Sequence, residues 1–288
     1  FWLMEQMEEA GLAGYVGKVN MDRNSPAGLC EESPEASAEA TESWILASAG
    51  LSNVRPILTP RFIPTCSDEL MERLSALQKQ YDLPVQSHLS ENLSEIDWVR
   101  QLQPEAFCYG DAYRMHGLFG GSCPTIMAHC VYSGEEEIRM MKEQGVFIAH
   151  CPESNTNLAS GITPARKYME LGMQMGLGTD VAAGSSLSMF RAMAMAVQCS
   201  KLRWRLVDQS QAPLTATEVF YLATKGGGAF FGKAGSLEEG YEFDAVVIDD
   251  RKIRHARPVS VRERLERLIY LDGDASVYAK YIKGKQVI

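Results

Sequence analysis

The sequence predicts an α/β fold of the (β/α)8 TIM-type barrel, in which strands and helices alternate along the chain. Between residues 14 and 180, six short apolar runs alternate with polar hinges and amphipathic segments. Several of these runs end on a histidine, an arginine or an aspartate, the position where such barrels carry their active sites. Because six strands are fewer than eight, we expect the first two strands of the barrel to lie before Phe1.

The expected strands share a short length and a high content of apolar or β-branched residues, as in a buried parallel sheet. In chain order they span residues 14–20, 54–62, 85–88, 125–129, 146–150 and 174–180.

Helix signals lie between the strands. Ser67 is expected to cap a helix that carries an apolar stripe at helical spacing. The residues of this stripe are Leu70, Met71, Leu74 and Leu77. Ser133 and Glu136 form an S-x-x-E pattern, which predicts a capping box at the start of the helix after residue 129. A long helix is expected over residues 188–204.

The character of the sequence changes after about residue 235. Residues 240–249 read as a turn that leads into a strand, and residues 281–288 read as a strand containing a Gly-Lys turn. We therefore expect residues 1–235 to form a barrel that lacks its first strands. Residues 236–288 are expected to form a β-sandwich segment that ends in the C-terminal strand.

Composition narrows the possible partners and the compartment. The 288 residues carry a net charge of -9 and contain no block rich in lysine or arginine, which argues against nucleic acid or an anionic membrane as a partner. No apolar run approaches the ~20 residues that a membrane-spanning helix needs. The seven cysteines are scattered without C-x-x-C spacing, as expected for reduced thiols in a cytoplasmic protein.

Polar residues recur at equivalent positions, where the expected strands end. These residues are Arg61, His88, His129, His150 and Asp180. Because the C-terminal ends of barrel strands converge on one face, we expect these side chains to lie near one another. Neutral imidazole and carboxylate are suitable ligands for Zn²⁺. The alternative for any one of these histidines is an ordinary polar residue at a strand end.

An ordered set of motifs resembles the amidohydrolase superfamily. The set consists of "HLSE" at 88–91, "AHC" at 128–130, "AHCPESN" at 149–155 and "GLGTD" at 176–180. Three further motifs resemble the guanine deaminase branch of that superfamily: "GKVNMD" at 17–22, "TPRF" at 59–62 and "EFDAVVID" at 242–249. The resemblance implies a (β/α)8 barrel with a small β-sandwich built from both chain ends. It also implies hydrolytic deamination of guanine to xanthine and ammonia, a step of purine catabolism, and a homodimer.

The resemblance also implies roles for individual residues. His88 and Asp180 would be ligands of one Zn²⁺ per subunit, with Fe²⁺ less favoured. Glu91 would be the proton shuttle, and His129 would assist the attacking water, with Asp180 accepting a proton from it. The substrate, a small purine, would be bound by Arg61 and Phe62 beside these groups.

The "HCPxSN" motif implies a further set of residues at the edge of the pocket: His150, Ser154 and Asn155. Several assignments have structural alternatives. Glu91 could only favour the start of a helix, Arg61 could be a surface residue, and Phe62 could be plain core. Asp180 could be a loop or cap residue.

One feature departs from the family. Amidohydrolases carry a His-x-His pair at the end of the first barrel strand, and this sequence contains no His-x-His. We expect the pair to precede Phe1, and without it the chain should hold zinc poorly. Two readings therefore compete with guanine deamination. One is a related amidohydrolase acting on another ring, such as an aminopurine, a pterin, a triazine or a cyclic amide. The other is an inactive fragment or scaffold without metal.

Overall fold

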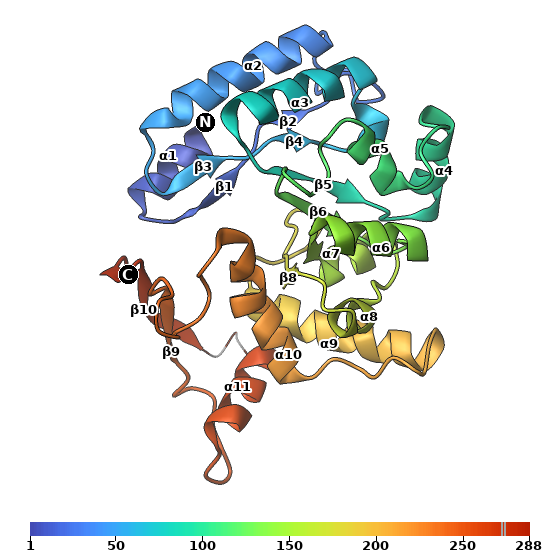
Figure 1. Cartoon of the computed structure of the whole chain (residues 1–288). Helices are drawn as coiled ribbons and strands as arrows, with labels where there is room; N and C mark the ends of the chain where they lie inside the picture. The colour runs from blue at the N-terminus through green and yellow to red at the C-terminus, as the bar shows by residue number, and fades with distance from the viewer. Residues whose placement is uncertain (272, 274) are drawn as a thin grey trace. The chain divides into compact units, whose positions relative to one another are not determined.

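The computed structural model describes residues 1–271, 273 and 275–288 (Figure 1). The chain divides into two units, residues 1–148 and residues 149–288. The division falls within strand β7 (Phe147–His150).

The first unit alternates short strands with helices. In chain order its elements are α1 (Trp2–Glu9), β1 (Gly14–Val16), β2 (Val19–Asn20), α2 (Pro34–Ala47), η1 (Ser48–Gly50), β3 (Val54–Pro56), β4 (Thr59–Pro60), η2 (Ile63–Thr65), α3 (Asp68–Tyr81), β5 (Val85–Leu89), α4 (Leu93–Leu102), α5 (Tyr109–Met115), β6 (Thr125–His129) and α6 (Glu135–Gln144).

The strands of this unit pair in parallel. β1 pairs with β3, β2 with β4, and β5 with β6. Leu58 forms a further parallel bridge with Val85, which joins the β4 segment to β5. Parallel neighbours need crossover connections, and helices supply these here. Strands β5, β6, β7 and β8 (Met175–Leu177) are adjacent in chain order in a four-stranded sheet, as predicted for an α/β fold.

The two expected strands at 14–20 and 54–62 are each divided into two shorter strands. Pro56 and Pro60 lack the N–H that a continuous ladder requires, so β3 and β4 each end at a proline. Gly17 lies between β1 and β2, where an added Cβ would come within 1.7 Å of Thr59 Oγ1. Only glycine allows this close approach of the two segments.

Helix α3 forms where the sequence predicts it. Ser67 is its N-cap, and the serine Oγ accepts a hydrogen bond from the backbone N–H of Leu70 at 3.1 Å. The predicted stripe of Leu70, Met71, Leu74 and Leu77 is buried. Figure 1 shows α3 beside α2, and Tyr81 Oη donates to Glu42 Oε1 across the two helices at 2.6 Å. Burial of the apolar stripe fixes the helix, since each buried leucine or methionine contributes about 1.5–3 kcal/mol.

The capping box predicted for α6 is wrong. The N-cap is Gly134, and no side-chain cap bond forms at this end. The hydroxyl of Ser133 is instead buried, and it has no hydrogen-bond partner among the described residues. The helix is held by its apolar face, since Ile138 and Met141 are buried.

The second unit begins with the last residues of β7 and ends in a small sheet. Its further elements are α7 (Pro152–Asn157), α8 (Ala165–Glu170), β8, α9 (Met189–Leu206), α10 (Ala216–Tyr221), η3 (Leu222–Gly226), η4 (Ala229–Phe231), β9 (Ala245–Asp249), α11 (Val261–Tyr270), β10 (Ser276–Ile282) and β11 (Lys285–Gln286). The predicted long helix is confirmed as α9. Within the described residues, no helix has the length and apolar character needed to cross a membrane.

The C-terminal sheet matches the expected β addition. β10 pairs with β9 and with β11 in antiparallel fashion, in the order β11-β10-β9. The hairpin between β10 and β11 turns at Gly284, whose φ of +79° lies in the left-handed region. The boundary predicted at residues 235 and 236 stays a prediction.

Candidate active site

Two neighbouring strand ends in the first unit present Arg61 and His88. Arg61 directly follows β4, and His88 is the penultimate residue of β5. The His88 Nδ1 atom lies 2.6 Å from the backbone carbonyl oxygen of Arg61. Because a carbonyl can only accept, this contact places the proton on Nδ1 and leaves the lone pair of Nε2 available. A metal-binding histidine is held in this way by the hydrogen bond of its other nitrogen.

The His88 ring is also held in its neutral form. Burial lowers the pKa of His88 below its usual value, and the adjacent His129 lowers it further. The two imidazole rings are stacked, with centroids 5.3 Å apart and an interplanar angle of 18°. A histidine must be neutral to bind a metal ion, and the lowered pKa favours this neutral form of His88.

Glu91 faces the second histidine. His129 ends β6 and is buried, and its Nε2 lies 3.7 Å from Glu91 Oε2. The backbone at His129 has a φ of +73°, and that of the following Cys130 is +47°. Non-glycine residues adopt such angles at a cost of about 1–3 kcal/mol, and they cluster at functional sites. The N-cap of α4 is Asn92, so Glu91 lies outside the helix and its carboxylate is directed toward His129.

An aromatic wall adjoins the histidines. The Phe62 ring meets His88 at a centroid distance of 6.4 Å and an angle of 65°, and it meets Trp98 at 6.4 Å and 86°. The guanidinium carbon of Arg61 lies 5.6 Å from the centroid of the same Phe62 ring. Phe62 is half-buried and Arg61 is exposed, so both offer part of their surface to a ligand. The sequence interpretation missed Trp98, which lies on α4 and carries no motif of its own.

A buried carboxylate, also missed, lies four residues after Glu91 in the sequence. Glu95 is buried on α4, and its Oε1 accepts a hydrogen bond from the Tyr109 hydroxyl at 2.6 Å. Its Oε2 is buried with no hydrogen-bond partner in the described part of the chain. Burial raises the pKa of Glu95, and the charge of Glu91 raises it further. The E-x-x-x-E spacing of Glu91 and Glu95 is visible in the sequence, but the burial of Glu95 is not.

The second unit contains the remaining predicted residues. His150 ends β7 and is buried, and its backbone carbonyl accepts from the N–H of Gly178 at 2.9 Å. Asn155 is buried on α7, and its Nδ2 donates to Thr163 Oγ1 at 3.0 Å. Ser154 is fully buried, and its hydroxyl meets no partner within the described residues.

Asp180 stands in the loop that follows β8. Its φ is +46°, and its carbonyl accepts from the N–H of Gly184 at 2.6 Å. Two contacts with α7 hold the rest of this loop: Ser185 donates to Glu153 at 2.5 Å, and Asn157 donates to the carbonyl of Ala183 at 2.8 Å. These contacts hold the segment that directly follows Asp180.

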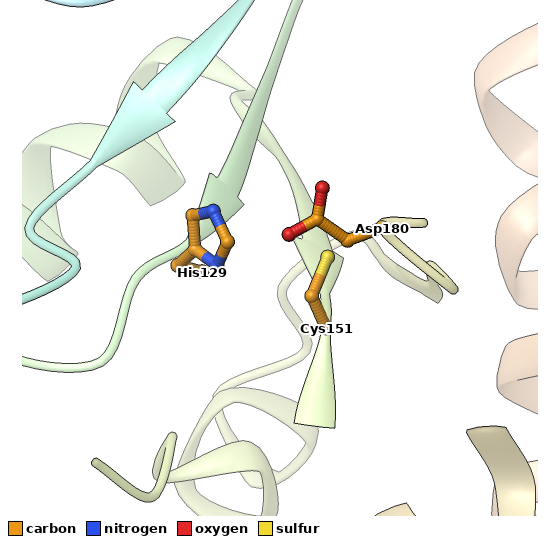
Figure 2. A group of neighbouring side chains, drawn as sticks. All are labelled: His129, Cys151 and Asp180. Atoms are coloured by element: carbon orange, nitrogen blue, oxygen red, sulfur yellow. The ribbon is translucent and has the colours of Figure 1, made fainter. Parts of the chain in front are cut away.

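The side chains of His129, Cys151 and Asp180 each stand at or just past the end of a strand, as Figure 2 shows. Within the second unit, Cys151 Sγ and a carboxylate oxygen of Asp180 lie within 4.8 Å of each other. Gly178 makes room for this thiol, because an added Cβ would meet Cys151 Sγ at 2.9 Å. The sequence interpretation assigned no role to Cys151, although it lies inside the "HCPESN" motif.

Each unit, taken by itself, carries donor groups of a kind that suits a divalent metal ion. His88 offers a neutral imidazole with a fixed tautomer, and Asp180 offers a carboxylate on a constrained loop. Imidazole and carboxylate bind Zn²⁺ and also several other divalent ions. A strand-end histidine whose Nε2 lone pair is available and a carboxylate near a second histidine are components that metal-dependent hydrolases use to activate water.

Comparison with known proteins identifies the family of the chain. The model of the amidohydrolase family matches residues 1–287, so the chain belongs to the amidohydrolase family. Within it, the chain is similar to guanine deaminases. It is 35% identical to the enzyme from Dictyostelium discoideum over 294 residues, which cover 99% of this chain and 64% of that protein. It is also 35% identical to the Homo sapiens enzyme over 302 residues, covering 99% and 65%.

A solved structure is similar over the whole chain. The crystal structure of guanine deaminase from C. acetobutylicum, with guanine bound in the active site, superposes with a TM-score of 0.94 and 46% identity. The match covers 100% of this chain and 68% of that one. The chain therefore spans about two-thirds of the length of these relatives, 64% and 65% for the two curated enzymes.

Proposed function

We propose that this chain provides most of the catalytic part of an enzyme that hydrolyses guanine to xanthine and ammonia. The observation that carries this proposal is the group of His88, His129 and Glu91, which lies beside Arg61 and Phe62. The same group places a potential metal ligand, a proton carrier and an aromatic face at consecutive strand ends. Similarity to guanine deaminases, one of them with guanine bound, favours guanine as the substrate.

We propose that His88 and Asp180 hold one zinc ion per subunit, with Fe²⁺ less favoured. The neutral His88 with its Nε2 lone pair supports this assignment. Bound zinc would lower the pKa of a water molecule toward ~7 and so supply hydroxide near neutral pH. Two further ligands would come from a His-x-His pair, which the 288 residues do not contain.

The chain's own groups would then move the protons. Glu91 would take one proton from the attacking water and deliver it to the purine ring nitrogen, and it would afterwards deliver a second proton to the leaving amine, which departs as ammonia. His129, whose Nε2 lies 3.7 Å from the Glu91 carboxylate, would donate a hydrogen bond to the attacking oxygen and stabilise the charge that develops there. Asp180 would accept that second proton from the same oxygen once it has added to the ring, and would release it for transfer to the leaving amine.

Substrate recognition would use the strand end at β4. The fork of N–H groups on Arg61 would donate to the purine carbonyl, and Phe62 would offer an apolar face to the ring. His88, Glu91 and Asp180 would lie beside the bound purine.

The remaining proposals concern the surroundings of the site. His150 and Asn155 would support the pocket edge. We also propose a barrel over residues 1–235 and a sandwich segment over 236–288. A homodimer and a cytoplasmic role in purine catabolism complete the proposal, with the scattered cysteines in support of that compartment.

Ammonia release tests the proposal. The complete polypeptide that carries this chain, loaded with zinc, should release ammonia from guanine and contain about one zinc per subunit. A panel of adenine, a pterin and a triazine separates guanine deamination from related activities. Preference for one of those rings over guanine would overturn the substrate assignment. A protein that takes up no zinc would overturn the metal assignment.

A further inference from the structure

Two buried hydroxyl groups lie directly behind His88. Ser87 precedes His88 on β5, and Tyr113 projects from α5. Tyr113 is fully buried and Ser87 is nearly so, and their hydroxyl oxygens are 2.8 Å apart. Burial of two hydroxyl groups destabilises the fold unless both groups form hydrogen bonds.

The pair is bonded to the two strand ends that form the site. Ser87 Oγ lies 2.7 Å from the carbonyl oxygen of Pro60 and 3.0 Å from that of Arg61. The Tyr113 hydroxyl lies 2.9 Å from the carbonyl oxygen of His88. Each hydroxyl has one proton to give. The Ser87 hydroxyl donates to the carbonyl oxygens of Pro60 and Arg61. The Tyr113 hydroxyl donates to the carbonyl oxygen of His88 and to the Ser87 oxygen.

The carbonyl oxygen of Arg61 connects the hydroxyl pair to His88, the candidate metal ligand. It lies 2.6 Å from His88 Nδ1 and also receives the Ser87 hydroxyl at 3.0 Å. The position of that oxygen sets both the tautomer and the orientation of the His88 ring. A shift of the β4 end relative to β5 would move the oxygen away from Nδ1.

We propose that Tyr113 and Ser87 are positioning residues for His88, which hold the Arg61 carbonyl where it fixes the imidazole for metal binding. This inference rests on the proposed function, because it takes His88 as a metal ligand. The Tyr113 hydroxyl holds two neighbouring residues of β5, Ser87 and His88, and Ser87 in turn donates to the carbonyl oxygens of Pro60 and Arg61 at the end of β4. Packing of the Tyr113 ring alone would be satisfied by a phenylalanine.

Tyr109 provides a matched control. It lies one turn earlier on α5, is also buried, and stacks on Tyr113 with ring centroids 5.8 Å apart and an angle of 14°. Its hydroxyl donates to Glu95 rather than to a strand end. Tyr109→Phe and Tyr113→Phe therefore remove the same atom from neighbouring buried rings, and they differ in what that atom holds.

The test measures zinc affinity in the complete polypeptide by competition with a chromogenic chelator. We expect Tyr113→Phe to raise the zinc dissociation constant by about tenfold or more, the range seen when a hydrogen bond behind a metal ligand is lost. Tyr109→Phe should change it by less than about twofold. Equal weakening by both variants would overturn the inference.

A second variant and a second readout keep the test decisive. If Tyr113→Phe does not fold, Ser87→Ala removes the other hydroxyl and should weaken zinc binding in the same way. In metal-free protein labelled with ¹⁵N-histidine, the wild-type His88 resonance should show the proton on Nδ1, and this fixed tautomer should be lost in Tyr113→Phe. Retention of the tautomer in Tyr113→Phe would contradict the positioning role. Wild-type protein that binds no zinc would instead overturn the proposed function itself.

Discussion

Replacement of Glu95 by glutamine is expected to stabilise the metal-free protein near neutral pH. The carboxylate is buried, Tyr109 donates to one of its oxygens, and the other has no partner among the described residues. Burial and the nearby Glu91 raise the pKa of Glu95. A neutral amide keeps an acceptor for Tyr109 and avoids a buried, half-satisfied charge, which is the more expensive group to desolvate.

The sign and size of this stability difference follow from the coupling between folding and protonation of Glu95. A carboxyl whose pKa is raised on folding stabilises most below its unfolded pKa, here 4.5, and loses that contribution as the pH rises through the folded pKa. As the pH rises from the unfolded to the folded pKa of Glu95, the free energy of unfolding of the wild-type protein should therefore fall relative to that of Glu95→Gln. The fall should be about 1.4 kcal/mol for each pH unit in this range. Above the folded pKa the difference should stay constant.

Urea unfolding at pH 4 and pH 7.5 measures this difference. Glu95→Gln should have the higher midpoint at pH 7.5, and the gain over wild type should shrink at pH 4. Asp97→Asn is the control, because Asp97 lies on the same helix but is exposed and pairs only at the surface with Arg100. That variant should stay within about 0.5 kcal/mol of wild type at both values. A less stable Glu95→Gln at pH 7.5 would refute the reasoning, since it would mean that the ionised carboxylate stabilises the fold.

Four further variants test the site and the fold. Glu91→Gln should lower kcat for guanine by about 10²–10⁴ because it cannot carry a proton, with zinc content unchanged; a kcat within tenfold of wild type would contradict the shuttle. Arg61→Lys should raise KM for guanine by about tenfold or more through loss of the planar fork, again with zinc content unchanged, and an unaltered KM would remove Arg61 from the binding site. Ser67→Ala should cost about 1 kcal/mol in urea unfolding because it removes the α3 cap. Ser133→Ala should cost less than about 0.5 kcal/mol because that hydroxyl caps nothing, and equal costs would contradict this difference.

The sequence predicts the fold class because local signals agree with the global arrangement. The apolar stripe of α3 and its Ser67 cap lie within a few residues of each other, so spacing alone reveals both. The strand ends at His88 and His129 are visible for the same reason. The α6 capping box fails because an S-x-x-E pattern does not determine which residue takes the cap, and Gly134 takes it here.

Other features depend on contacts that local spacing does not encode. The division of two expected strands follows from prolines and from the close approach of Gly17 to Thr59, which are 42 residues apart. Glu95 and Tyr109 meet only because α4 packs against α5. The bond from Tyr113 to the carbonyl of His88 likewise needs α5 to lie behind β5. Glu95 and Tyr113 become candidates for a role at the site only once their burial and their hydrogen-bond partners are known.

Guanine turnover by the complete, zinc-loaded polypeptide tests the central claim most directly. We expect equal amounts of xanthine and ammonia, loss of both products after zinc is removed with a chelator, and recovery when zinc is returned. A correctly folded, zinc-loaded protein that releases no ammonia from guanine would contradict it.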